Sequence, residues 1–342
     1  MEKFQHGGDI YTRKIKYDFS ANISPLGMPK EAEQALIKNV GLFEHYPDPD
    51  CMALRRAIAA EYGCNAEDII CGNGASELIY ASVLAFAPKK ALLIAPCFSE
   101  YERALESVGC EIEYFYLSED SGFELNEDIL NYLTSDIDMF IFGSPNNPTG
   151  RLVSDRIMKL IAEKCSENGI AVMADQCFIE FAQNWKEYSA YKYPNVMLLN
   201  AFTKIYAMAG LRLGYMICCD NAANSLIRSK IPCWSVSLPA QVCGEAALSA
   251  AGYKERVRSL TECGREFLMK SFDDLGIKYY QSDVNFILFR SELPLDKLLL
   301  NDGIAIRSCD NYVGLEKGHF RIAVRSREEN EYLIGCIGKY YK

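Results

Sequence analysis

The alternation of short apolar runs with helical patterns most constrains the fold of this chain. Seven apolar runs predict strands, over 68–71, 91–95, 112–116, 139–143, 170–174, 196–199 and 213–218. Helical patterns lie between most of them, over 72–86, 99–108, 127–133 and 154–168. Parallel strands need such crossovers, so we predict an α/β fold with a mostly parallel seven-stranded sheet and helices on both faces.

Two departures from simple alternation refine this prediction. The run 213–218 follows 196–199 too closely for a crossover helix, so its strand should be antiparallel to its neighbour. A long helical stretch over 237–275 then leads away from the sheet. The remaining patterns predict a smaller C-terminal α+β domain, with strands at 285–289, 304–306 and 319–324 and a helix at 328–341.

The beginning of the chain has a different character. Residues 1–28 show little periodicity, and their glycines and prolines predict an extended arm that packs on the rest of the protein. Between 29 and 63, two helical patterns flank a proline-rich turn at 45–50. The predicted organisation is therefore an arm at 1–28, a large domain at 29–236 and a small domain at 237–342.

Charge and cysteine usage limit the possible partners and the compartment. The formal net charge is −10, which disfavours nucleic acid and anionic membranes as partners. No apolar run approaches the ~18 residues that a membrane span needs, and the N-terminus lacks a signal-peptide pattern. Fourteen scattered cysteines without a C-x-x-C pair favour a reducing cytoplasm over a disulfide framework, and three distant histidines argue against a metal site.

A lysine in an unusual place indicates the chemistry. Lys204 follows the apolar run 196–199, and its apolar or small neighbours should desolvate its amine and lower its pKa. Such an amine forms Schiff bases with carbonyl compounds, while the fork of Arg212 suits a phosphate. This pair suggests pyridoxal phosphate, whose ring nitrogen needs a carboxylate such as Asp175. The alternative for Lys204 is a solvated loop lysine, and that for Asp175 is a carboxylate capping a strand end.

These motifs resemble those of a known family. Asn-Asn-Pro-Thr-Gly at 146–150, then Asp175, then Lys204 and Arg212, resemble the ordered signature of fold-type I pyridoxal-phosphate enzymes of the aminotransferase class I/II superfamily. The resemblance implies that Lys204, Asp175 and Asn147 are catalytic, with Asn147 bonding a ring oxygen of the cofactor. The alternative for Asn147 is a residue that only satisfies its turn.

The resemblance also implies a cofactor site. Phe98 matches the aromatic residue that stacks on the ring, and the residues matching the phosphate site are Ala75, Ser76, Thr203, Arg212 and Tyr46. Tyr46 would come from a neighbouring subunit, which implies a homodimer with shared active sites. Without the resemblance, Ser76 would be read as a helix cap and Phe98 as a core residue.

Three positions depart from the family pattern. Ala201 stands where relatives carry a hydroxyl toward the phosphate, Phe178 replaces a tyrosine, and Gln-Cys at 176–177 replaces Glu-Ala. The first departure implies weaker cofactor retention. The second implies a shifted pKa of the Schiff base.

Two late arginines indicate an anionic substrate. Arg321 lies inside an apolar strand pattern, where an unpaired charge is costly, and Arg307 follows the strand pattern 304–306. By resemblance, Arg321 would bind the substrate α-carboxylate and Arg307 a substrate phosphate. His6 and Asn22 are candidates for further donors to that phosphate, although His6 could equally be an exposed residue of the arm.

Nearly the whole chain is similar to one subgroup. His-Gly-Gly at 6–8, the segment 18–29 and the segment 307–315 are similar to threonine-phosphate decarboxylases. The implied reaction converts L-threonine O-3-phosphate, or L-serine O-phosphate, to an amino-alcohol phosphate for cobalamin biosynthesis. A histidinol-phosphate-type aminotransferase is the alternative. A ligand-binding module that keeps the fold is a third reading, but the arm is too short and too weakly helical for an attached DNA-binding segment.

Overall fold

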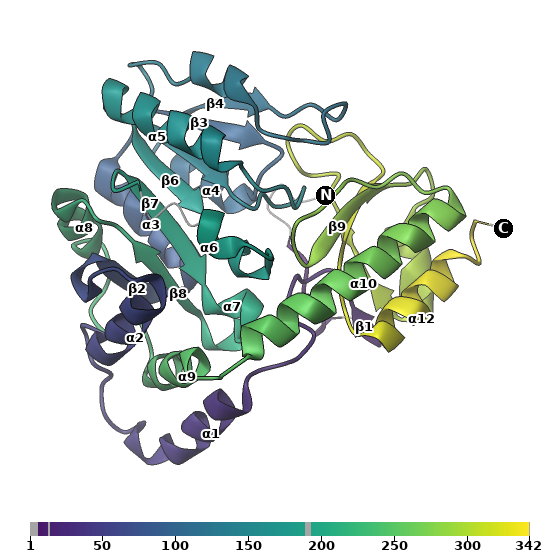
Figure 1. Cartoon of the computed structure of the whole chain (residues 1–342), viewed down its shortest axis with the longest axis horizontal. Helices are drawn as coiled ribbons and strands as arrows, with labels where there is room; N and C mark the ends of the chain where they lie inside the picture. Colours follow the sequence, from purple (N-terminus) through teal and green to yellow (C-terminus); the bar gives the residue numbers. More distant parts are fainter. Residues whose placement is uncertain (1–5, 13, 189–192, 342) are drawn as a thin grey trace.

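Two units lie side by side in the computed structural model, which describes residues 6–12, 14–188 and 193–341. The long helix α10 (Tyr253–Leu275) runs from the larger unit into the smaller one (Figure 1). The larger unit contains most of the strands that the sequence predicts. The smaller unit contains the C-terminus.

The larger unit is built on a seven-stranded sheet whose spatial order is β2-β8-β7-β6-β5-β3-β4. Its strands are β2 (Ile69–Asn73), β3 (Lys90–Ala95), β4 (Glu111–Tyr116), β5 (Met139–Gly143), β6 (Ala171–Asp175), β7 (Val196–Ala201) and β8 (Leu213–Ile217). β8 is antiparallel to both β2 and β7, whereas the other neighbouring pairs are parallel. The predicted mostly parallel sheet with one antiparallel strand is therefore confirmed.

Helices cover both faces of this sheet, as its apolar strands require. Along β5, Phe140 and Phe142 pack into the layer on one face, whereas Met139 and Ile141 pack into the layer on the other. Helices on the Phe140 side include α2 (Met52–Tyr62), α5 (Asp155–Asn168) and α9 (Leu238–Leu248). Helices on the Met139 side include α3 (Gly74–Phe86), α4 (Ser99–Glu106) and α8 (Asn221–Arg228). The alternation along each strand is the two-residue period of a sheet buried on both sides.

Two helical predictions need correction. The expected helix at 127–133 is a short 3-10 helix, η3 (Glu127–Asn131), which begins where the Asn126 side chain accepts a hydrogen bond from the Asp128 backbone. The stretch 237–275 is two helices, α9 and α10, because Gly252 adopts a left-handed φ of 66° that neither helix can continue through.

The smaller unit has an antiparallel three-stranded sheet with helices packed on it. The sheet consists of β11 (Arg307–Ser308), β12 (His319–Ala323) and β9 (Phe286–Arg290), and its core includes residues of α10 and α12 (Arg327–Ile337). The strand expected at 304–306 is the two-residue strand β10 (Ile304–Ala305). It pairs with β1 (Tyr17–Asp18), so the arm is anchored on the smaller unit.

The predicted domain boundaries at 28 and 236 stay predictions. Helix α9 lies beyond the second boundary, yet it packs against α1 (Lys30–Lys38) and α2 of the larger unit. Among the described helices, none has the length and apolarity that would cross a membrane. All fourteen cysteines fall within the described ranges and are free thiols, and the cytoplasmic location expected from them stays a prediction.

Candidate active site

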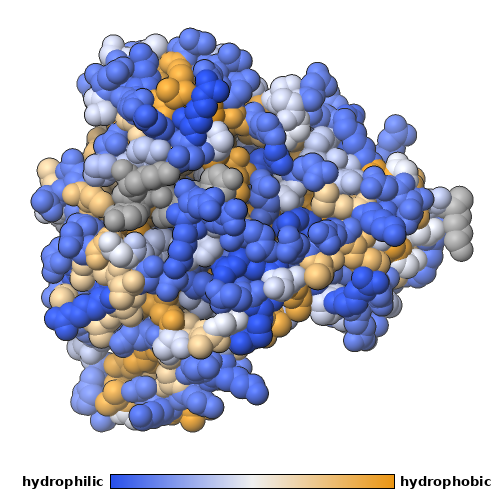
Figure 2. Space-filling model, viewed as in Figure 1, coloured by the Kyte–Doolittle hydropathy of each residue, from blue (hydrophilic) through white to orange (hydrophobic). Residues whose placement is uncertain are grey.

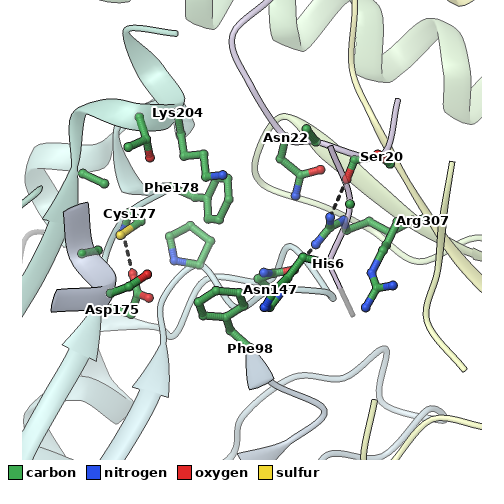
Figure 3. Close-up of a pocket in the computed structure, with 18 of the residues that line it drawn as sticks. His6, Ser20, Asn22, Phe98, Asn147, Asp175, Cys177, Phe178, Lys204 and Arg307 are labelled. Carbon is green, nitrogen blue, oxygen red and sulfur yellow. Dashed lines mark hydrogen bonds between the residues drawn. The ribbon is translucent and has the colours of Figure 1, made fainter. Parts of the chain in front are cut away.

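A cavity of about 220 Å³ lies at the carboxyl edge of the large sheet. Parallel strands bring the residues at their carboxyl ends to one edge, where ligands of α/β sheets gather. Twelve of the thirteen predicted site residues line the cavity: His6, Asn22, Ala75, Ser76, Phe98, Asn147, Asp175, Thr203, Lys204, Arg212, Arg307 and Arg321. The larger unit, the smaller unit and the arm each supply part of its wall (Figure 3).

Lys204 is presented by the short helix α7 (Phe202–Ile205), which follows β7 directly. Burial lowers the pKa of its amine to about 8, and the positive charges of Arg321 and Arg212 act in the same direction. Its Nζ lies 5.9 Å from the ring centroid of Phe178. The lowered pKa expected from its apolar neighbours is thus confirmed, and the amine can act as a nucleophile near neutral pH.

Asp175 is the last residue of β6 and is held by two donors. Its Oδ1 accepts a hydrogen bond of 2.9 Å from the Cys177 backbone, and its Oδ2 accepts one of 2.6 Å from the Tyr101 hydroxyl. Burial, together with the charge of Asp175, raises the pKa of Tyr101 well above its ordinary value, so Tyr101 stays a donor. The carboxylate is therefore fixed in orientation at the floor of the cavity.

Tyr101 is a cavity residue that was not among the predicted site residues, although the sequence contains a signal for it. Tyr101 is three residues after Phe98, and this spacing places two side chains on the same face at the start of α4. Their rings lie 5.7 Å apart in an edge-to-face arrangement. A predicted stacking residue at the start of a helix therefore indicates the residue three positions later as a second cavity residue.

The start of α3 and Arg212 form an anion cradle. Gly74 begins α3 with a left-handed φ of +78°, and a Cβ added there would overlap the Nη2 of Arg212. A Cβ on Gly214 would likewise overlap the backbone nitrogen of Ala75. The first backbone N–H groups of a helix lack intrahelical partners, so they and the Arg212 guanidinium together fit a phosphate. Asn73 is the N-cap, so helix capping does not explain Ser76.

Two arginines face each other across the antiparallel pair β11 and β12. Arg307 lies directly opposite Arg321, and the two residues are 5% and 6% exposed. Arg321 donates through Nη2 to the Ser20 carbonyl at 2.9 Å and through Nη1 to Asn147 Oδ1. Arg307 donates to Asn311 Oδ1 at 2.8 Å. Like charges directly opposite are unfavourable, so this wall of the cavity fits anionic groups.

Asn22 adds a buried polar group to the same cavity. It is 2% exposed, and within the described part of the chain its Oδ1 has no hydrogen-bond partner. Buried polar atoms are nearly always paired, so an atom without a partner at a cavity wall is available to a ligand. Of the residues that depart from the family pattern, Ala201, Cys177 and Phe178 line the cavity, and Gln176 is not among its lining residues.

Tyr46 is the one predicted site residue outside the cavity. It is 78% exposed, and its ring stacks on Trp234 with a centroid separation of 4.5 Å. A single chain does not test the expectation that it serves a neighbouring subunit, which stays a prediction.

Comparison with known proteins agrees with this geometry. The family model for aminotransferase class I and II matches residues 14–337. A threonine-phosphate decarboxylase from Salmonella typhimurium is 37% identical over 326 residues, which cover 94% of this chain and 90% of the relative. An adenosylcobalamin biosynthesis bifunctional protein from Leptospira interrogans is 32% identical over 98% of this chain and 41% of its own length.

At least one solved structure has the same fold as this chain. The histidinol-phosphate aminotransferase from Clostridium acetobutylicum superposes with a TM-score of 0.89 at 27% identity, covering 95% of this chain and 99% of that one. The family match and the sequence similarity both span nearly the whole chain. This chain therefore belongs to the aminotransferase class I and II family.

Proposed function

We propose that the protein is a pyridoxal-phosphate-dependent enzyme that decarboxylates L-threonine O-3-phosphate or L-serine O-phosphate. The products would be carbon dioxide and an amino-alcohol phosphate that serves the synthesis of cobalamin-type cofactors. The names of the decarboxylase and cobalamin-biosynthesis relatives support this reaction. The single observation that carries the proposal is a cavity with a low-pKa lysine at one end and two buried, opposed arginines at the other.

The residues of the cavity fit the cofactor. Lys204 would hold its aldehyde carbon, Asp175 its ring nitrogen, and the cradle of Gly74 and Arg212 its phosphate. Phe98 would stack on the ring. When bound, pyridoxal phosphate supplies an electron sink for the bond that breaks at the substrate Cα.

The protein groups control protons around this ring. Asp175 would keep a proton on the ring nitrogen, and the Tyr101 hydroxyl fixes the orientation of this carboxylate. Asn147 accepts from Arg321 through its oxygen, so its amide nitrogen is the atom that would donate to a ring oxygen. With a pKa of about 8, Lys204 keeps an ammonium fraction at neutral pH that would donate the proton which Cα gains in place of the carboxylate.

The opposed arginines define the substrate class. A phosphoamino acid carries a carboxylate and a phosphate, and two neighbouring guanidiniums can bind one each through paired hydrogen bonds. We assign the carboxylate to Arg321 and the phosphate to Arg307, and the amide nitrogen of Asn22 would donate to that phosphate. Binding both ends of the substrate orients the Cα bonds relative to the cofactor ring, and that orientation selects the reaction.

The experiment that tests the proposal measures both products. Purified protein loaded with pyridoxal phosphate is incubated with L-threonine O-3-phosphate and, separately, with L-serine O-phosphate. We expect release of carbon dioxide together with an equal amount of the amino-alcohol phosphate, and loss of both in Lys204→Ala. Protein that releases no carbon dioxide from either compound, yet transfers amino groups to 2-oxoglutarate, would overturn the proposal.

The alternative function is that of a histidinol-phosphate-type aminotransferase. The structural similarity to the Clostridium acetobutylicum enzyme, which spans 95% of this chain, favours it. The cavity also fits an amine that bears a phosphate. If the protein has this function, an amino donor alone should convert the cofactor to a stable pyridoxamine form. The conversion would be measured as a lasting loss of absorbance at visible wavelengths.

We also infer a homodimer in which Tyr46 contributes to the cofactor phosphate site of the partner. Exposed apolar side chains lie on and after α1 and at Trp234: Ile37, Val40, Leu42, Phe43, Tyr46 and Trp234. Figure 2 shows apolar surface at the lower edge of the molecule, where Figure 1 has α1. An apolar surface of this kind on a folded chain fits a protein–protein interface.

A further inference from the structure

Glu100 lies against His6, the arm residue at the cavity wall. His6 Nε2 is 2.8 Å from Glu100 Oε1, and the two side chains are 42% and 11% exposed. A carboxylate only accepts hydrogen bonds, so Nε2 is the donor. This bond lowers the pKa of the Glu100 carboxyl. Nδ1 has no hydrogen-bond partner in the described ranges, so it is the ring nitrogen open to a ligand.

His6 stands at the Arg307 end of the cavity. A second cavity of about 280 Å³ lies on the other side of the arm, and both cavities are lined by His6, Gly7, Ser20 and Arg307. Figure 3 shows the His6 ring beside Asn147, on the side toward Arg307. A group bound by Arg307 would therefore lie near His6.

Contacts toward both the smaller and the larger unit hold the arm in place near His6. Toward the smaller unit, the Gly8 backbone donates to Ser20 Oγ at 2.7 Å, and the Ser20 carbonyl accepts from Arg321. Toward the larger unit, the His6 ring packs 5.5 Å from the Phe98 ring. The hydrogen bond to Glu100 is the polar contact on this second side, and it sets the rotation of the imidazole.

We propose that Glu100 is a positioning residue that holds His6 with Nδ1 toward the substrate phosphate and so favours phosphorylated substrates. This inference rests on the proposed function and deepens it. Without His6, the buried Glu100 carboxylate would repel the phosphate, because its other cationic neighbour, Arg103, is 3.5 Å away and 53% exposed. With His6 between them and protonated at both ring nitrogens, Nε2 donates to the carboxylate and Nδ1 donates to the anion.

Kinetics of three single variants test this role. We expect Glu100→Ala to raise KM for L-threonine O-3-phosphate about tenfold while kcat changes by less than about twofold, because a charge-assisted hydrogen bond to the substrate is weakened. Glu100→Gln should rescue part of the effect, since its amide oxygen still accepts from Nε2. Glu106→Gln, which removes a carboxylate from the other end of α4, is the control and should leave KM unchanged.

A double variant separates positioning from a structural role. If Glu100 acts through His6, Glu100→Ala should no longer raise KM in a His6→Ala background, where KM should stay the same or fall because a repelling carboxylate is removed. Effects that multiply in the double variant, or an unchanged KM in Glu100→Ala, would overturn the proposal.

A spectroscopic measurement tests the role of Glu100 independently of the proposed reaction. The chain has three histidines, so ¹⁵N spectra of histidine-labelled protein can be assigned with His6→Ala. Adding inorganic phosphate should shift the Nδ1 signal of His6 in the wild type but not in Glu100→Ala. If the wild type releases no carbon dioxide but the two proteins show this difference, the proposed reaction is wrong and the role of Glu100 is still supported. If phosphate shifts the Nδ1 signal of His6 equally in both proteins, Glu100 does not have the proposed role.

Discussion

The amine of Lys204 is buried, and the positive charges of Arg321 and Arg212 act on it, so its charge changes with pH in a range unusual for a lysine. Its pKa of about 8 lies below the ordinary value of 10.5, and the neutral, nucleophilic form therefore grows as pH rises through 8. We expect the rate at which cofactor-free protein takes up pyridoxal phosphate to rise up to about pH 8 and level off above it. Borohydride trapping followed by intact mass measurement gives this rate. Lys204→Ala should trap no cofactor at any pH, and a rate that still climbs steeply above pH 10 would contradict the lowered pKa.

Tyr101 is a second residue on which cofactor binding should depend, and sequence patterns did not predict it. Its hydroxyl donates to Asp175 at 2.6 Å, and hydrogen bonds to charged groups contribute about 1.5–3 kcal/mol. Tyr101→Phe should therefore raise the dissociation constant for pyridoxal phosphate about tenfold or more. Tyr114→Phe is the matched control, because that hydroxyl donates to Glu102, which does not line the cavity. Equal cofactor affinities of the two variants would show that Asp175 does not depend on Tyr101.

At the scale of elements, the junction of β2 and α3 carries the phosphate cradle. Gly74 needs a left-handed φ and leaves room for the Arg212 guanidinium, whereas Gly169 at the end of α5 needs the same φ and has open space around it. Alanine at either position should cost about 1–2 kcal/mol of folding free energy because of the backbone alone. Gly74→Ala should in addition displace Arg212 and weaken cofactor binding. Urea unfolding and cofactor titration of both variants separate the two effects, and Gly74→Ala with unchanged cofactor affinity would contradict the cradle.

The element scale also shows where local patterns stop being informative. The strand predicted at 304–306 ends at Ala305 as β10, and Arg307 begins a separate strand, β11, in a different sheet. Because of this division, Arg307 is a strand residue opposite Arg321 instead of a loop residue after a strand. Strand partners lie far away in sequence, so the local apolar pattern that predicted the strand does not contain the division.

For the whole molecule, the inferred homodimer makes a sharp prediction about subunit mixing. If Tyr46 serves the partner's site, Lys204→Ala and Tyr46→Ala homodimers are each impaired at both sites. Co-refolding them in equal amounts should produce heterodimers with one intact site each, so that roughly a quarter of all sites recover. Carbon dioxide release measures the recovery. No recovery above the sum of the separate proteins would mean that Tyr46 acts within its own chain or not at all.

Sequence patterns alone predicted the sheet and its single antiparallel strand, because strand and helix periodicity is local. Parallel strands bring their carboxyl ends to one edge, so Asp175 and Lys204 could be expected there from their positions after strands. Asn147 and most other cavity residues were predicted from the resemblance to a known family. Only the tertiary structure decided which side chains meet across long separations. Tyr101 contacts Asp175 over 74 residues, His6 contacts Glu100 over 94, and Arg321 contacts Asn147 over 174. Such contacts depend on how strands, helices and the arm pack in three dimensions, and no periodicity along the chain encodes them.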